Sequence, residues 1–179
     1  MARARFQAPK GTQDILPPVS ARWEALLATF AAVVERGGYG LLQSPLFEEI
    51  GVFQRDSEGA DAVRKEMYDF TDKGGRHIAL RPEGTASAVR AFVQHQPGAP
   101  WKVWYATPAF RYENVQAGRL RQHHQVGLEL LGTADPDADV EIISLGWEFL
   151  QALGLRRVEL LVNTMGTAAD RLALSLIHI

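Results

Sequence analysis

Cysteine is absent from the 179-residue sequence, which excludes disulfide scaffolds, thiolate metal sites and cysteine nucleophiles. No run approaches the roughly 18 consecutive apolar residues that a membrane-spanning helix needs, so we expect no membrane partner. The basic start at residues 1–5 is not followed by an apolar segment, which argues against secretion and favours a cytoplasmic location. An excess of one charge is also lacking, because 19 Lys and Arg oppose 21 Asp and Glu, a net −2. The chain therefore has no overall positive electrostatic field that would attract nucleic acid.

Metal-ligand spacing is equally absent among the five histidines. His123 and His124 are adjacent, so they point to opposite sides of a strand and cannot clamp one ion, and we expect no protein-built metal site. There is no P-loop, G-x-S-x-G or H-E-x-x-H motif. The chain is instead 46% hydrophobic and 22% charged, which is typical of an ordinary folded domain.

Helical periodicity appears in three segments of the chain. The first helix is expected to begin at an N-cap of Ser20 and to end at Gly37-Gly38, and a short amphipathic helix covers 85–94. The third has Asp135 as N-cap, Pro136 at its first position and Gly154 just past its end. Its expected packing face consists of Val140, Ile143, Trp147 and Leu150.

Strand patterns separate these helices. A strand at 39–47 is interrupted by Pro45, and a hairpin over 66–70 and 78–80 turns at Asp72-Lys73-Gly74-Gly75. Further strands are expected at 103–106, resuming at 110–113, and at 122–131 and 158–162, with loops at 55–64 and 114–120. The sum is an α+β fold, an antiparallel sheet flanked by helices.

The strands before and after the 114–120 loop carry an unusual set of polar residues. Alternation places Arg111 and Glu113 on one face, and it places Gln125 and Glu129 together with Gly127 between them. A solvated sheet face would have the same pattern. A glycine between long polar side chains, however, often marks the close approach of a ligand.

Two further features could complete a ligand site. Arg119, in the loop, would join Arg111 to suit a polyphosphate. In Leu80-Arg81-Pro82-Glu83-Gly84-Thr85, a carboxylate and a hydroxyl at a helix start could orient an ammonium group. The alternative is that Glu83 or Thr85 only caps that helix, since acidic and hydroxyl residues are favoured there.

These blocks, in this order, resemble the histidyl-tRNA synthetase family. The resemblance covers about residues 6–171 and rests on Lys10-Gly11-Thr12-Gln13-Asp14-Ile15-Leu16-Pro17, Lys65-Glu66-Met67-Tyr68-Asp69-Phe70, the 80–85 segment, Phe110-Arg111-Tyr112-Glu113, Gln116-Ala117-Gly118-Arg119 and His124-Gln125-Val126-Gly127-Leu128-Glu129. It implies a class II aminoacyl-tRNA synthetase catalytic core. The implied reaction is ATP-dependent activation of L-histidine, with Mg2+, followed by transfer to tRNA(His).

The resemblance also implies a role for each candidate residue. Arg111 would be catalytic and contact both the ATP α-phosphate and the histidine carboxylate. Glu113 would contact the adenine and Arg119 the outer phosphates, so the ATP set is Arg111, Glu113 and Arg119. Glu83 and Thr85 would hold the substrate ammonium, and Gln125 and Glu129 would complete the histidine pocket. Pro45 matches the motif 1 proline, which implies a homodimer interface there.

The departures from the family shape the remaining expectations. Residues 1–171 are expected to form a partial catalytic core with motifs 1 and 2 but without motif 3, and 172–179 to be a non-family, artefactual tail. We expect the chain as written to be inactive in aminoacylation. The alternative function is that of the synthetase-like regulatory subunit of ATP phosphoribosyltransferase, which binds histidine without charging tRNA. The combined Arg111, Glu113 and Arg119 set favours the synthetase.

Overall fold

The computed structural model describes residues 6–54, 66–163 and 166, so the predictions for 55–64 and 172–179 concern residues outside its description. The described elements, in chain order, are α1 (Val19–Arg36), β1 (Gly40–Leu41), β2 (Phe47–Glu49), a 3-10 turn η1 (Ile50–Val52), β3 (Asp69–Thr71), β4 (His77–Leu80), α3 (Thr85–His95), β5 (Trp101–Phe110), β6 (Gln122–Leu131) and α4 (Pro136–Ala152). The α+β class predicted from the sequence is confirmed.

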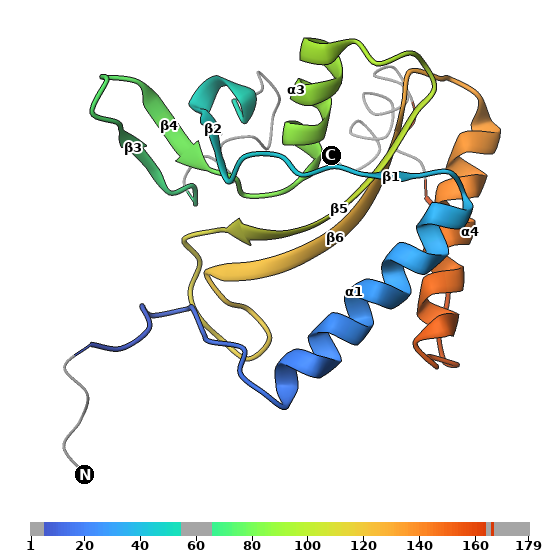
Figure 1. Cartoon of the computed structure of the whole chain (residues 1–179), viewed down its shortest axis with the longest axis horizontal. Coiled ribbons are helices and arrows are strands. Elements are labelled where there is room, and N and C mark those ends of the chain that lie inside the picture. The colour runs from blue at the N-terminus through green and yellow to red at the C-terminus, as the bar shows by residue number, and fades with distance from the viewer. Residues whose placement is uncertain (1–5, 55–65, 164–165, 167–179) are drawn as a thin grey trace, which may run out of the picture.

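A long antiparallel ribbon of β5 and β6 runs through the middle of the molecule (Figure 1). Short β1 adds to β5 in parallel, which gives the order β1-β5-β6, while β2, β4 and β3 form a separate antiparallel sheet. In Figure 1, α1 and α4 lie on one side of the ribbon, and α3 with the smaller sheet lies on the other. The ribbon is therefore covered on both sides by different elements.

The main core lies between the ribbon and the α1–α4 pair. Phe30, Val33 and Val34 of α1 are buried there with Trp104 of β5 and Leu145 of α4. The rings of Phe30 and Trp104 meet edge to face at a centroid distance of 5.9 Å, a favourable aromatic geometry. This face of the ribbon follows the apolar half of the strand alternation.

The predicted turn and cap signals are largely found in place. The β3–β4 hairpin turns at Asp72, whose Oδ1 accepts hydrogen bonds from the backbone N–H of Gly74 and Arg76. Asp135 caps α4 by accepting from the N–H of Asp137 at 3.0 Å, and Pro136 follows it. The start of α1 differs, because the N-cap is Pro18, not Ser20, and no side chain caps it.

The predicted packing face of α4 is wrong. Val140 is 60% exposed and Trp147 is 39% exposed, whereas Leu145 is buried with Ile142 and Phe149 packed beside it. In α3, likewise, the small residues pack inward and the larger Val89 and Val93 are exposed; the buried ones are Ala86, Ser87, Ala88 and Ala91. Small side chains let α3 approach its neighbours closely.

Two strand predictions also need correction. The strand β5 is unbroken through Pro108, because Phe110, two residues on, donates its N–H to Arg81 on the side away from β6. The nitrogen of Pro108 points the same way, so the β5–β6 ladder loses no bond there. Residues 111–113 lie past the end of β5, and 158–162 form no strand because no described strand pairs with them.

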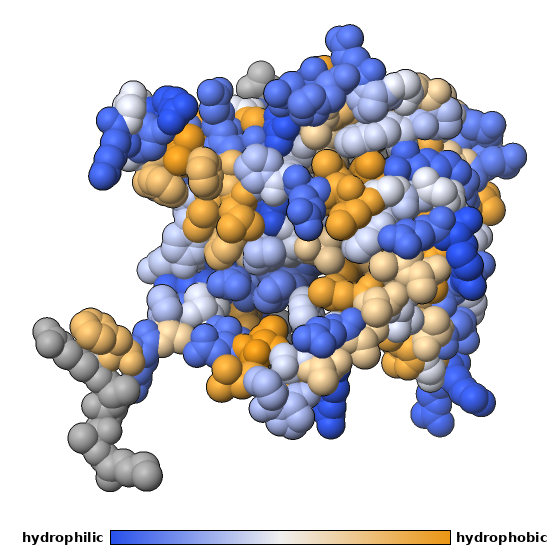
Figure 2. All heavy atoms as spheres, viewed as in Figure 1, coloured by the Kyte–Doolittle hydropathy of each residue, from blue (hydrophilic) through white to orange (hydrophobic). Residues whose placement is uncertain are grey.

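Apolar side chains remain exposed on the smaller sheet and α3. Figure 2 shows orange groups among blue ones on this face of the molecule, and the exposed apolar residues in these elements, and just before β2, include Leu46, Phe47, Phe70, Val89 and Val93. None of the helices in the described part of the chain is long and apolar enough to cross a membrane.

Candidate active site

The start of α3 is the point where five of the seven predicted site residues meet. Gln125 on β6 accepts a hydrogen bond from the N–H of Gly84 through its Oε1 at 2.9 Å. Glu129, four residues further along β6, accepts a hydrogen bond from the Thr85 hydroxyl at 2.7 Å. Alternation along β6 brings these two side chains to the same face, toward the segment that precedes α3. The structure therefore brings Thr85, Gln125 and Glu129 together.

Arg111 approaches the same segment from the end of β5. Its Nε donates to the carbonyl oxygen of Pro82 at 3.0 Å. Its backbone N–H donates to Arg121, which extends the β5–β6 ladder one step beyond the last residue of the strand. The guanidinium is thus held beside the segment that Gln125 also contacts, with its remaining N–H groups able to bind an anion.

Glu83 caps α3, which is the alternative that the sequence left open. Its two carboxylate oxygens accept from the backbone N–H of Thr85 at 2.7 Å and of Ala86 at 2.8 Å. An acidic group is favourable at a helix N-terminus, where free N–H groups concentrate. Each oxygen retains a second lone pair, so capping leaves room for a further donor.

Glu113 and Arg119 lie apart from this cluster, in the connection between β5 and β6. Arg119 Nε is 2.7 Å from Glu113 Oε2, and Glu113 is largely buried while Arg119 is mostly exposed. The contact is an ion pair without the alignment of a hydrogen bond. The two side chains that the resemblance implies for adenine and phosphate binding therefore neutralise each other here.

Tyr105 was missed as a site residue. It is 5% exposed, and its hydroxyl donates to Glu129 Oε1 at 3.1 Å. Burial, together with the neighbouring Glu129 charge, raises the pKa of Tyr105 well above its ordinary value. The signal that could have found it is register, because Tyr105 pairs with Gly127, midway between Gln125 and Glu129.

Arg81 is a second residue that sequence reasoning left without a role. It is 3% exposed, and burial lowers its pKa. Its Nε donates to the carbonyl of Pro108 at 2.9 Å, and its Nη1 donates to the Ser44 hydroxyl at 2.9 Å and the Pro45 carbonyl at 3.3 Å. Arg81 therefore ties the start of the 82–85 segment to β5 and to the chain before β2.

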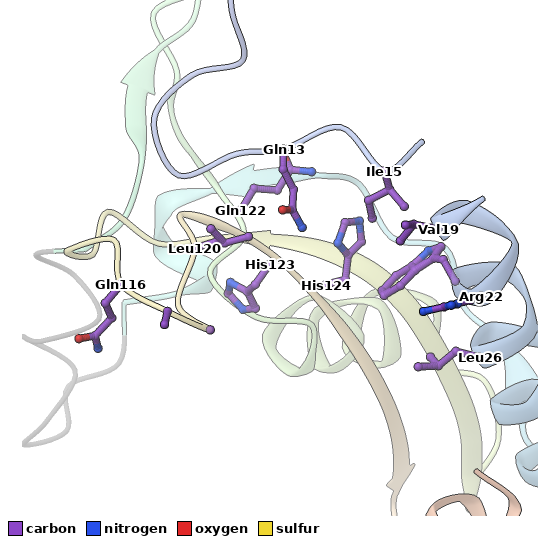
Figure 3. Close-up of a pocket in the computed structure, with 13 residues that line it drawn as sticks. Gln13, Ile15, Val19, Arg22, Leu26, Gln116, Leu120, Gln122, His123 and His124 are labelled. Carbon is purple, nitrogen blue, oxygen red and sulfur yellow. The ribbon is translucent and has the colours of Figure 1, made fainter. Parts of the chain in front are cut away.

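A separate pocket of about 680 Å3 lies at the start of β6, beside α1 (Figure 3). Its walls come from the chain before α1, the first turns of α1, the 116–120 loop and the start of β6; they include Gln13, Arg22, Trp23, His123 and His124. None of the predicted site residues lines it. Burial lowers the pKa of both histidines, and Arg111 adds to the effect on His123. In the described ranges, no three His, Asp or Glu side chains cluster as a metal site.

The central β5–β6 ribbon, with α1 and α4 on one side and α3 on the other, has the fold of a class II aminoacyl-tRNA synthetase core. The sequence model for the family described as histidyl-tRNA synthetase matches residues 11–174. The chain belongs to the histidyl-tRNA synthetase family.

Individual relatives agree with this assignment. The histidine–tRNA ligase of Synechocystis is 48% identical over 170 residues, covering 93% of this chain and 38% of the relative. That of Halothermothrix orenii is 49% identical over 164 residues, covering 89% of this chain and 39% of the relative. The chain thus spans about 40% of the length of the curated relatives it matches.

Solved structures share the fold. Apo histidyl-tRNA synthetase from S. aureus is 34% identical with a TM-score of 0.78, over 94% of this chain and 40% of that one. A Bacillus halodurans protein described as an ATP phosphoribosyltransferase regulatory subunit/histidyl-tRNA synthetase is 23% identical with a TM-score of 0.73, over 88% of this chain and 40% of that one. At that identity the second likeness concerns the fold alone.

Proposed function

We propose that this chain is the part of a histidine–tRNA ligase that binds histidine and ATP. In the first step the carboxylate of L-histidine attacks the α-phosphorus of ATP and pyrophosphate leaves. In the second the histidyl group passes from the adenylate to the 3′ end of tRNA(His). The observation that carries the proposal is the meeting of Gln125 and Glu129 with the start of α3, in a chain of this family.

Arg111 is the proposed catalytic residue. Its Nε is already engaged by the Pro82 carbonyl, which fixes the guanidinium plane and leaves its terminal N–H groups for oxygen ligands. In this position it would bind the histidine carboxylate and the α-phosphate together and stabilise the charge that develops as the new bond forms. Holding the two reactants in line reduces the entropic barrier of their reaction.

The amino-acid half of the proposed site consists of Glu83, Thr85, Gln125 and Glu129, and Arg111 is shared between it and the nucleotide half. Glu83 and Thr85 would accept hydrogen bonds from the substrate ammonium, in addition to the capping bonds of Glu83. Gln125 and Glu129 would complete the histidine pocket. This half is already organised, because hydrogen bonds of 2.7 to 2.9 Å link the side chains of Glu83, Gln125 and Glu129 to the start of α3.

The nucleotide half is proposed to comprise Arg111, Glu113 and Arg119. The Glu113–Arg119 ion pair would open when adenine engages Glu113 and the outer phosphates engage Arg119. Magnesium would arrive with ATP, as part of the substrate, and the described part of the chain offers no acidic cluster to hold it independently. The bound ion would supply neutralisation of phosphate charge.

The regulatory-subunit alternative accounts for less of this arrangement. A histidine sensor needs the amino-acid half and the carboxylate contact of Arg111 only, and it gives no reason for Glu113 and Arg119. The 48% identity to a histidine–tRNA ligase further favours the ligase, whereas the 23% identity to the structure described as both proteins speaks for the fold.

The remaining proposals concern the whole protein. We propose a cytoplasmic homodimer that uses the region of Pro45, where apolar residues of the smaller sheet are exposed. We also propose that residues 1–171 are a partial catalytic core, that 172–179 are not part of the family sequence, and that the 179-residue chain alone is inactive. The basis for the last point is that the chain spans about 40% of its relatives.

The test is histidine-dependent exchange of pyrophosphate into ATP, measured on the sequence extended to the length of its relatives. Arg111→Ala should lower the rate about 10²–10³-fold, the usual scale for losing one charge-stabilising donor. The matched control is Arg76→Ala, which removes an exposed arginine of the β3–β4 hairpin and should leave exchange unchanged. Exchange that survives Arg111→Ala would overturn the catalytic role, and histidine binding without any exchange would favour the regulator.

A further inference from the structure

Tyr105 occupies the centre of the amino-acid half without a role assigned by the family resemblance. Its ring lies between the backbone at Gly84, before α3, and at Gly127 on β6. A Cβ added at Gly127 would come within 2.5 Å of the ring Cζ and the hydroxyl oxygen, and one at Gly84 would overlap the ring edge. The two glycines therefore make the space that the ring fills, and the close approach that the sequence suggested at Gly127 is made by Tyr105.

The hydroxyl of Tyr105 acts on a single carboxylate oxygen. It donates to Glu129 Oε1 at 3.1 Å, and the Thr85 hydroxyl donates to the same oxygen at 2.7 Å. Among the described residues, none donates a hydrogen bond to Oε2 of Glu129, and none forms an ion pair with this carboxylate. Two donors thus fix one oxygen of Glu129 and leave the other available.

We propose that Tyr105 is a positioning residue that orients Glu129 for binding the amino-acid substrate, with Oε2 as the acceptor for an N–H group of the substrate. The inference rests on the proposed function, since it assigns Glu129 to the histidine pocket. A carboxylate that accepts from hydroxyl donors and has no cation beside it among the described residues suits a protonated or N–H-bearing substrate group.

Two properties suit Tyr105 to this task. Burial and the charge of Glu129 raise the pKa of its phenol, so the hydroxyl stays protonated and remains a donor throughout the neutral range. The ring is also confined between two backbone segments, so little side-chain freedom is lost when the substrate binds. Orientation of Glu129 is therefore set before the substrate arrives.

The chain offers a matched control in Tyr39. It is 2% exposed and belongs to the opposite side of the ribbon, in the core with Trp104. Burial, with a contribution from Glu141, raises the pKa of Tyr39 as well. Tyr39→Phe and Tyr105→Phe therefore each remove one buried hydroxyl, and only that of Tyr105 donates a hydrogen bond to a residue of the proposed pocket.

The experiment measures pyrophosphate exchange on the sequence extended to the length of its relatives, with the KM of histidine and of ATP determined separately. Tyr105→Phe should raise the KM of histidine about tenfold or more, the effect of losing a hydrogen bond to a charged group, with the KM of ATP unchanged. Tyr39→Phe should change neither. Combining Tyr105→Phe with Glu129→Gln should raise the histidine KM by less than the product of the single effects, because Tyr105 acts through Glu129.

Each outcome decides a different point. Equal changes in both KM values, or multiplicative effects in the double variant, would overturn the positioning role and leave the ligase function standing. No exchange by the extended wild-type protein would overturn both. If Tyr105→Phe does not fold, Gly127→Ala replaces it, since the new Cβ must displace the phenol from Glu129. An unchanged histidine KM in that variant would equally refute the proposal.

Discussion

The two faces of the β5–β6 ribbon share one backbone and differ in almost everything else. One face packs Trp104, Val126 and Leu128 against α1 and α4. The other presents Tyr105, Gln125 and Glu129 to the start of α3. Since successive side chains of a strand point to opposite faces, neighbouring residues alternate between the packed face and the polar face. The packed core on one face thus fixes the backbone that carries the polar side chains of the other face.

A buried tyrosine beside a glutamate occurs on each side of the ribbon, with different electrostatics. Glu141, next to Tyr39, has Lys102 Nζ at 2.7 Å, and the hydrogen bond from Lys102 lowers the pKa of Glu141. Among the described residues, only the hydroxyl groups of Thr85 and Tyr105 donate hydrogen bonds to Glu129. The first carboxylate is already neutralised by the protein, whereas the second is suited to a positive group from elsewhere.

The largest expected effect concerns the packed face. Trp104→Ala removes a 7% exposed indole from the core and should lower the free energy of unfolding by about 3–5 kcal/mol. Urea denaturation of the 179-residue chain measures it. Trp147→Ala, on the exposed side of α4, is the matched control and should cost much less. Equal losses in the two variants would mean that the ribbon face is not the dominant core.

The next effect sharpens the contrast within the polar face. Gly127→Ala places a Cβ against the Tyr105 ring and should destabilise the chain by about 1–3 kcal/mol, the usual range for overpacking. Gly146→Ala is the control, because no atom lies within 4 Å of its added Cβ and alanine favours the helix interior. Thermal unfolding should therefore move in opposite directions for the two variants. A neutral Gly127→Ala would show that the ring is not confined.

How far the sequence predicts this arrangement depends on whether the signal is local. Turn and cap chemistry is local, so Asp72 and the Asp135-Pro136 helix start are found where the residues predict them. The polar alternation of Gln125 and Glu129 is local too, and the structure has them on one face. These features depend on near neighbours, which a sequence contains.

The failures depend on contacts between distant segments. Both faces of α4 are apolar, so its packing side at Leu145 is chosen by α1 and the ribbon, and Trp147 remains exposed. Tyr105 joins the site through its register with Gly127, which the length of the 111–121 connection alone does not determine. A strand at 158–162 would need a partner strand, and an apolar run alone does not provide one.

A smaller effect separates the two readings of Glu83. Glu83→Ala removes the acceptors for two N–H groups at the start of α3 and should cost about 1 kcal/mol, the scale of a lost helix cap. Glu83→Gln keeps one acceptor oxygen and should lose less stability. If Glu83 also binds the substrate ammonium, both variants of the extended protein should raise the KM of histidine. Loss of stability with no change in that KM would assign Glu83 to capping alone.

The smallest expected effect is on the pH dependence of stability, to which two adjacent histidines on opposite faces of β6 contribute. Burial lowers the pKa of His123 and His124, and Arg111 lowers that of His123 further. Because the folded state favours the neutral rings, their contribution to stability is complete above the unfolded pKa near 6.5 and is lost as pH falls through the lower folded values. Thermal stability should therefore decline from pH 7 toward pH 5 with a shallower slope in His124→Gln.

The same pair of histidines reports which face each belongs to. In an NMR titration, Arg111→Ala should raise the pKa of His123 and leave that of His124 unchanged, since burial alone accounts for the shift of His124. His124 instead lies edge to face with Trp23 at a centroid distance of 4.6 Å, on the side of α1. Equal pKa changes in the two rings would mean that the charge of Arg111 acts on both faces of the ribbon. The two faces would then not be electrostatically distinct.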